Sequence, residues 1–170
     1  MLTPQDAAKH LLKLERAEES FDGFIRLHNP KWKLPDFHSK LIGALDNLEK
    51  GIGPRNLLIT MPPRHGKSTF GSVFFPAYFM ARKPSRFIMS TSYNSQLATD
   101  FGRQVRDLVN DPLTIQAFPD LEMSQDSRAV DNWRTTGGGG GYFIGVGGTT
   151  TGRAANILLV DDPLKSREEA

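Results

Sequence analysis

The strongest pattern in the chain is the octapeptide Met61-Pro62-Pro63-Arg64-His65-Gly66-Lys67-Ser68. It matches a phosphate-binding loop, Gly-x-x-x-x-Gly-Lys-Ser/Thr, except that Met61 replaces the first glycine. In such loops, backbone N–H groups and the N-terminus of the next helix point at phosphate oxygens. Gly66 allows close backbone approach, Lys67 supplies positive charge to the β- and γ-phosphates, and Ser68 supplies a hydroxyl to Mg²⁺. The octapeptide therefore predicts a site for ATP and Mg²⁺.

The flanks of the octapeptide have the expected order of elements. The apolar run 56–61 predicts a buried strand before the loop, and an apolar segment from Gly66 to about Ala81 predicts a helix after it. Pro76 should bend or interrupt that helix. A Gly-Lys-Ser triplet alone is common, but its place between a strand and a helix makes the prediction specific.

A second acidic motif supports the nucleotide site. Residues 156–160 predict another buried parallel strand, which ends at Asp161 and Asp162. We expect Asp161 to hold Mg²⁺, directly or through water. Asp162 is interpreted either as the carboxylate that orients the attacking water or as a helix cap, since Pro163 follows and suits a first helical position.

The remaining loop residues are expected to line the nucleotide. The predicted binding set is Pro63, Arg64, His65, Gly66, Lys67, Ser68 and Thr69. An arginine at position 64 can reach the γ-phosphate and neutralise charge in the transition state. The alternative for Arg64 is a surface ion pair, and His65 is interpreted as a spacer rather than as an acid or base.

Helices and loops are expected in the N-terminal part. Thr3 and Pro4 predict a helix start, with an apolar stripe at Ala7, Ala8, Leu11 and Leu14. The segment 21–35 is expected to be irregular. A second helix, capped by Asp36, should end at Gly51 and present Phe37, Leu41, Ala44, Leu45 and Leu48 on one face.

The later segments alternate between strand and helix patterns. Residues 86–91 predict a strand, Asn94 predicts a helix cap, and 111–128 is expected to be a loop. Gly137–Gly141 is interpreted as a turn between two short strands or as a low-complexity linker, and a second glycine-rich loop should run through Gly152. This alternation predicts an α/β fold, a P-loop NTPase with a mostly parallel central sheet flanked by helices.

Composition limits the possible classes of protein. The 170 residues are 38% hydrophobic and 24% charged, which is typical of a globular domain. The net charge of +2 is too small to indicate a DNA footprint by itself. The absence of cysteine excludes disulfides and thiolate zinc sites. No signal peptide or membrane-length apolar run is visible, so we expect a cytoplasmic protein without a membrane partner.

Taken together, these motifs resemble the large terminase subunit of tailed bacteriophages. The likeness extends from about Phe21 to Ala170, and besides the two motifs above it includes Phe37-His38, Ser90–Asn94, Gly145–Gly148 and Thr151–Arg153. The resemblance implies an ATPase that drives double-stranded DNA into a procapsid inside a bacterial host. Its implied partners are the DNA, the portal protein, the small terminase subunit and further copies of the chain in a ring.

The resemblance also implies roles for individual residues. It favours Arg64 as a catalytic arginine, and it places His38, with Phe37, near the adenine; a polar residue on a packed helix is the alternative for His38. Arg153 resembles an arginine offered across a subunit interface, with a surface or DNA-facing arginine as the alternative.

The expected organisation is an N-terminal helical region, 1–50, and a P-loop ATPase core, 51–170, that stops after the acidic (Walker B) strand. The nuclease domain of the family is expected to be absent. Two other hypotheses stay open: a different P-loop translocase or helicase-like ATPase acting on nucleic acid, and a nucleotide-binding fragment without turnover.

Overall fold

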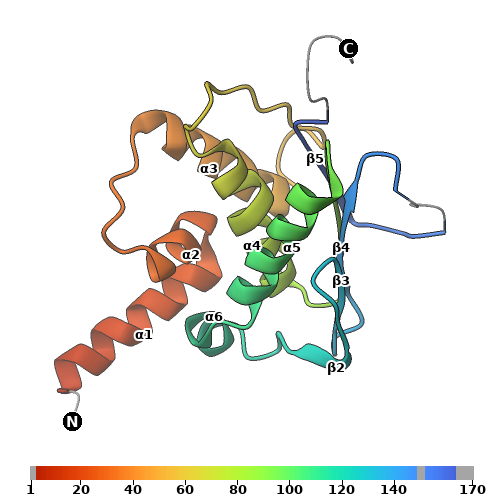
Figure 1. Ribbon diagram of the computed structural model, residues 1–170. Helices are drawn as coiled ribbons and strands as arrows, with labels where there is room; N and C mark the ends of the chain where they lie inside the picture. Colours follow the sequence, from red (N-terminus) through yellow and green to blue (C-terminus); the bar gives the residue numbers. More distant parts are fainter. Residues whose placement is uncertain (1–2, 149–151, 164–170) are drawn as a thin grey trace.

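The computed structural model describes residues 3–148 and 152–163 and has a mixed α/β fold (Figure 1). Its five-stranded sheet has the order β2-β3-β4-β1-β5. The strands are β1 (Phe87–Ser92), β2 (Met123–Arg128), β3 (Asn132–Thr135), β4 (Gly140–Gly145) and β5 (Ile157–Asp161). Strands β4, β1 and β5 run parallel, whereas β3 is antiparallel to both β2 and β4. The sheet is therefore mixed.

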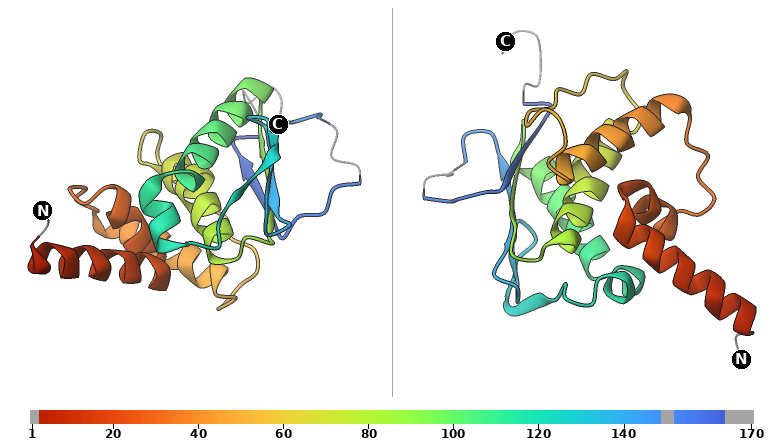
Figure 2. Two further views of the ribbon diagram at one scale, coloured as in Figure 1. Left: turned by 90° about the horizontal axis from the view of Figure 1, so that it is seen from below. Right: turned by 180° about the vertical axis from the view of Figure 1, so that it is seen from behind.

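The helices lie on one face of this sheet in all three views (Figures 1 and 2). They are α1 (Pro4–Glu19), α2 (Phe21–His28), α3 (Asp36–Glu49), α4 (Phe75–Arg82), α5 (Ser95–Val109) and α6 (Pro112–Ala117), with a π-helical segment η1 (Thr69–Phe74) directly before α4. Among the described residues, no helix is both long and apolar enough to cross a membrane.

An aromatic cluster joins α2 to α4 and forms the centre of the core. The ring of Phe21 lies 5.3 Å from Tyr78 and 5.6 Å from Phe75, and Phe24 lies 5.6 Å from Tyr78. All four rings are fully buried. Large buried rings contribute much of the hydrophobic stabilisation of a small domain, so this cluster holds the N-terminal helices against the helix that follows the 61–68 loop.

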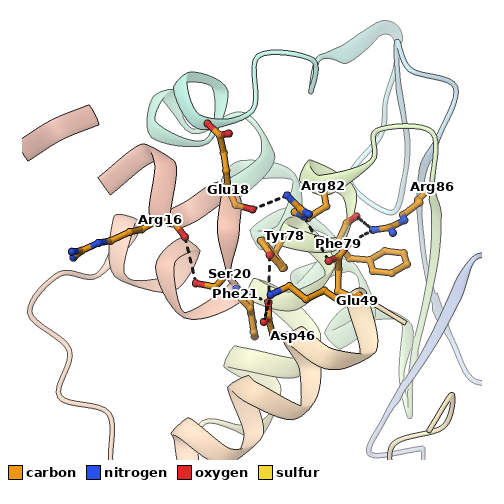
Figure 3. A network of polar contacts seen from close by, with 11 residues as sticks. Arg16, Glu18, Ser20, Phe21, Asp46, Glu49, Tyr78, Phe79, Arg82 and Arg86 are labelled. Carbon is orange, nitrogen blue, oxygen red and sulfur yellow. Dashed lines mark hydrogen bonds and ion pairs between the residues drawn. The ribbon is translucent and has the colours of Figure 1, made fainter. Parts of the chain in front are cut away.

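Polar contacts around two acidic residues of α3 connect the same parts of the chain (Figure 3). The carboxylate of Glu49, at the end of α3, accepts a hydrogen bond from Arg86 at 2.6 Å and lies 3.6 Å from the guanidinium of Arg82. Nearby, Asp46 accepts from the backbone N–H of Phe21 at 2.9 Å. These contacts connect α3 with α2, α4 and the start of β1.

Several expected elements are confirmed. Thr3 caps α1, Asn94 caps α5 by accepting from Leu97 N–H, and Gly51, with φ of 70°, follows the end of α3. The strands β1 and β5 form near their expected positions and pair in parallel. Of the five glycines, Gly137–Gly139 lie in the turn between β3 and β4, and Gly140 and Gly141 begin β4, so the linker interpretation is wrong.

The expected strand at 56–61 is not formed. This segment has no regular secondary structure, and the side chain of Leu58 is 89% exposed. An apolar run becomes a strand only when a neighbouring strand supplies hydrogen-bond partners, and among the described residues β5 pairs only with β1. β5 itself was expected to be buried, but Leu158 and Val160 are 59% and 56% exposed, because none of the helices that the structure describes covers that face of the sheet.

Two expected loops contain helices. The segment 21–35 includes α2, and 111–128 includes α6 and β2. Both helices are short, and each is capped by the side chain before it: Ser20 accepts from Gly23 N–H, and Asp111 accepts from Leu113 N–H. Helices of this length depend on tertiary packing, which local periodicity does not reveal.

Three further details of the helices differ from expectation. Asp36 is the first residue of α3 rather than its cap, which is Pro35. In the stripe expected on α1, Leu14 is buried, but Ala7 and Ala8 are exposed and Leu11 is 58% exposed. The helix expected from Gly66 to about Ala81 forms, since 67–82 is continuously helical, but its first part is the π-helical η1, and Pro76 lies in the first turn of α4 without interrupting the helix.

Candidate functional site

The structure brings Lys67 beside both acidic residues at the end of β5. Lys67 Nζ lies 3.2 Å from Asp161 Oδ1 and donates a closer hydrogen bond to Asp162 Oδ1. The lysine and Asp162 are 95 positions apart in the sequence. The octapeptide and the acidic strand end, which were recognised separately, thus form one cluster of charges.

Two opposing effects act on the pKa of Lys67. Burial lowers the pKa, and hydrogen bonds and charge interactions with Asp162 and Asp161 raise it; the net result is a raised pKa. Lys67 is therefore a cation at neutral pH, compensated by two carboxylates. A phosphate group could replace those carboxylates as the partner of the ammonium group.

Asp161 is the buried member of the cluster, with 6% of its surface exposed. Its Oδ2 accepts a hydrogen bond of 2.8 Å from Ser72 Oγ. Ser72 belongs to η1 and is also buried. The sequence analysis did not single out Ser72, because a serine inside an apolar helix carries no motif signal.

The 61–68 loop turns sharply at two residues with positive φ, namely Arg64 (63°) and Gly66 (81°). A Cβ atom at Gly66 would lie 3.0 Å from the ring of Phe70 and 3.2 Å from His38 Nε2. Gly66 is needed here both for its conformation and for its small size. The side chain of Arg64 is exposed, so it is free to move toward a ligand.

Helix α3 supports the loop through His38. His38 Nε2 donates to the backbone carbonyl of His65 at 2.8 Å, and the His38 ring packs 4.8 Å from Phe70. His65 Nδ1 in turn donates to Pro63 O at 2.8 Å. His65 thus closes a local turn, which agrees with its interpretation as a spacer.

Two pockets adjoin at the loop and share Arg64, Gly66 and Thr69. The first, of about 350 Å³, is polar and is lined by Pro63, Lys67, Ser68 and Asp162 among others. The second, of about 370 Å³, is lined by the aromatic side chains Trp32, Phe37, His38 and Phe70. Trp32 and Phe70 escaped the sequence analysis because their positions relative to the loop depend on the fold.

Arg153 lies in a different place. Its guanidinium carbon is 4.5 Å from the centre of the Tyr142 ring, and its side chain lines a pocket of about 470 Å³ with Ser95, Asp131 and Asn132 among others. Arg153 does not line the aromatic pocket, nor either of the two pockets that Lys67 lines. The structure therefore does not bring this predicted catalytic residue to Lys67 within one copy of the chain.

Few metal-binding side chains surround Lys67 in the described part of the chain. Within residues 3–148 and 152–163, no group of three or more His, Cys, Asp or Glu side chains could hold a metal. Asp161 and Ser68 provide one carboxylate and one hydroxyl. Both are oxygen donors, the type that Mg²⁺ prefers, and Mg²⁺ commonly binds through one or two carboxylates together with waters and phosphate oxygens of a substrate.

Comparison of the chain with protein-family models, with curated proteins and with solved structures gave no match.

Proposed function

We propose that this chain binds and hydrolyses ATP with Mg²⁺ in a P-loop fold, as the motor portion of a terminase large subunit that packages double-stranded DNA. The observation that carries the ATPase proposal is the position of Lys67 between Asp161 and Asp162. A lysine from a Gly-Lys-Ser loop and acidic residues at the end of a parallel strand are the parts that P-loop enzymes combine.

Each side chain has a defined task in this proposal. Lys67 exchanges its carboxylate partners for the β- and γ-phosphates of the nucleotide, and Arg64 contacts the γ-phosphate. Asp161 and Ser68 would hold Mg²⁺, and the ion would supply positive charge that neutralises the phosphates. Asp162 orients the water that attacks the γ-phosphate. The hydrogen bond between Lys67 and Asp162 supports this assignment, because the exposed Asp162 carboxylate lines the polar pocket together with Lys67.

The aromatic pocket is the proposed site for the adenine. Its walls include Trp32, Phe37 and His38, and it adjoins the polar pocket through Arg64, Gly66 and Thr69. Aromatic rings bind nucleobases by stacking. A triphosphate in the polar pocket would leave its base beside these rings.

The DNA-packaging part of the proposal rests on the resemblance of the motifs. Arg153 fits the role of an arginine offered to a neighbouring subunit, because its side chain is exposed and lies outside the pockets beside Lys67. The partners in this role are double-stranded DNA, the portal protein, the small terminase subunit and other copies of the chain in a ring.

The ATPase proposal is tested by calorimetry with ATP and Mg²⁺ together with a phosphate-release assay. Lys67→Ala should weaken ATP binding by about 100-fold, or roughly 2.7 kcal/mol. The control Lys9→Ala, which removes an exposed lysine of α1, should bind like the parent chain. Asp162→Asn should keep ATP affinity and lose phosphate release. Unchanged ATP affinity in Lys67→Ala would refute the site.

The same assays separate the other hypotheses. ATP binding without phosphate release by the parent chain would favour a nucleotide-binding role without turnover. Release stimulated by double-stranded DNA agrees with a packaging motor. Stimulation by single-stranded DNA together with strand separation would instead favour a helicase-like translocase.

A further inference from the structure

Ser72 and Asp161 form a buried pair behind the loop. Ser72 is 5% exposed, and its Oγ donates to Asp161 Oδ2 at 2.8 Å. The other carboxylate oxygen, Oδ1, faces Lys67 Nζ at 3.2 Å. The two oxygens of Asp161 therefore have different partners, and the hydroxyl of Ser72 holds one oxygen while the other faces Lys67.

Burial alone does not produce such a hydrogen bond. Ser90 and Ser92 on β1 are 1% and 0% exposed, yet their hydroxyls have no hydrogen-bond partner in the described part of the chain. Ser92 is even the register partner of Asp161 on the adjacent strand. The contact between Ser72 and Asp161 is therefore a feature of this position rather than a general property of buried serines here.

The π-helical geometry of η1 accounts for the position of Ser72. Phe75 N–H bonds to Phe70 O, five residues earlier, so the turn is wider than in an α-helix. Ser72 lies five residues after Lys67, and both side chains reach the same carboxylate. Single π-helical turns occur frequently at functional sites, where they change the direction of a side chain.

We infer that Ser72 is a positioning residue, which holds the Asp161 carboxylate so that Oδ1 faces the loop and the cation that accompanies the nucleotide. The inference rests on the proposed function. When the Lys67 ammonium group contacts the phosphates instead of Asp161, the hydrogen bond from Ser72 to Asp161 remains. A buried carboxylate with a fixed hydrogen-bond donor keeps its orientation, whereas one without it must reorganise to bind a cation.

The test measures ATP affinity by calorimetry as a function of Mg²⁺ concentration. In Ser72→Ala, the Mg²⁺ concentration for half-maximal enhancement of ATP binding should rise about tenfold, as expected for the loss of a hydrogen bond to a charged group. ATP affinity in the presence of a chelator should stay at the parent value. The matched control Ser90→Ala removes a buried hydroxyl without a partner and should leave both quantities unchanged.

A double-mutant cycle makes the test specific to this pair. Asp161→Asn should abolish the Mg²⁺ dependence, and adding Ser72→Ala to it should have no further effect on that dependence. Equal loss of ATP affinity in Ser72→Ala with and without Mg²⁺ would overturn the inference, because it would show that Ser72 only supports the loop. An unchanged Mg²⁺ midpoint in Ser72→Ala would also overturn it.

Failure of the proposed function gives a different result. In that case the parent chain would show no Mg²⁺-dependent ATP binding, or Lys67→Ala would bind like the parent. The inference about Ser72 fails while the proposed function stands if three results occur together. The parent binds ATP in a Mg²⁺-dependent way, Asp161→Asn loses that dependence, and Ser72→Ala keeps the parent's Mg²⁺ midpoint.

Discussion

Gly66 is constrained by its backbone and by its neighbours at the same time. Its φ of 81° is unfavourable for any residue with a Cβ, and a Cβ would lie within 3.0 to 3.3 Å of Phe70 and His38. Gly66→Ala should therefore lower the free energy of unfolding by about 1–3 kcal/mol, as measured by urea denaturation. It should also weaken ATP binding, because the loop must shift.

Gly43→Ala is the matched control for this substitution. Gly43 lies inside α3, and a Cβ there would meet nothing within 4 Å. Because alanine favours helix, Gly43→Ala should stabilise the chain by roughly 0.5–1 kcal/mol. If Gly66→Ala were as stable as the parent, the described conformation of the loop would be wrong.

His28 is expected to make stability depend on pH. It lies at the end of α2, with Nε2 3.0 Å from Thr114 Oγ1, and burial lowers its pKa below the ordinary 6.5 although Asp111 acts in the opposite direction. The unfolded chain therefore binds a proton at His28 more readily than the folded chain. The contribution of neutral His28 to the free energy of unfolding is fully present above pH 6.5, and it is lost as the pH falls below that value.

Urea denaturation at a series of pH values between about 7.5 and 5.5 checks this expectation, since that range spans the ordinary histidine pKa. The parent chain should lose more stability over this range than His28→Gln does. Identical pH slopes for the two proteins would show that the imidazole is protonated equally well in the folded and unfolded chains.

At the level of elements, β5 presents different side chains on its two faces. Ile157 and Leu159 pack against the core, whereas Leu158 and Val160 are exposed on the face without helices. The double variant Leu158→Lys with Val160→Thr should change the free energy of unfolding by no more than about 0.5 kcal/mol. It should also reduce light scattering by concentrated protein, because an apolar edge strand promotes association.

Leu159→Lys is the contrasting substitution on the same strand. It would place a charge against the core and should cost about 2 kcal/mol or more in the same denaturation experiment. If both variants lost equal stability, the assignment of the two faces of β5 would be incorrect.

For the whole molecule, Glu49 connects the N-terminal helices with the sheet. Its side chain is 4% exposed and contacts Arg86, which is 20% exposed. Glu49→Ala would leave Arg86 without its acidic partner, and it should lower the free energy of unfolding by about 3 kcal/mol. Asp22→Ala removes one member of an ion pair whose side chains are 46% and 51% exposed, so it should cost at most about 0.5 kcal/mol. Equal effects of the two variants in urea denaturation would contradict the connecting role of Glu49.

Much of the local structure was predictable because its causes are local. The helix starts at Thr3 and Asn94 depend on a side-chain oxygen and an N–H group three residues away. The strands β1 and β5 were recognisable as apolar runs, and the octapeptide with Asp161 and Asp162 was recognisable as motifs. The roles of these motif residues in ATP hydrolysis stay predictions.

The sequence by itself indicated several helix starts, the positions of β1 and β5 and the motif residues on which the ATPase proposal depends, since capping, periodicity and motif spacing act over a few residues. Only the tertiary structure decided that 56–61 forms no strand, that α2 and α6 form, and that Ser72 and Trp32 border the site. It also decided that Arg153 lies in another pocket. The physical reason is that hydrogen-bond partners, burial and ring contacts for these residues come from distant segments, and local sequence patterns do not record those neighbours.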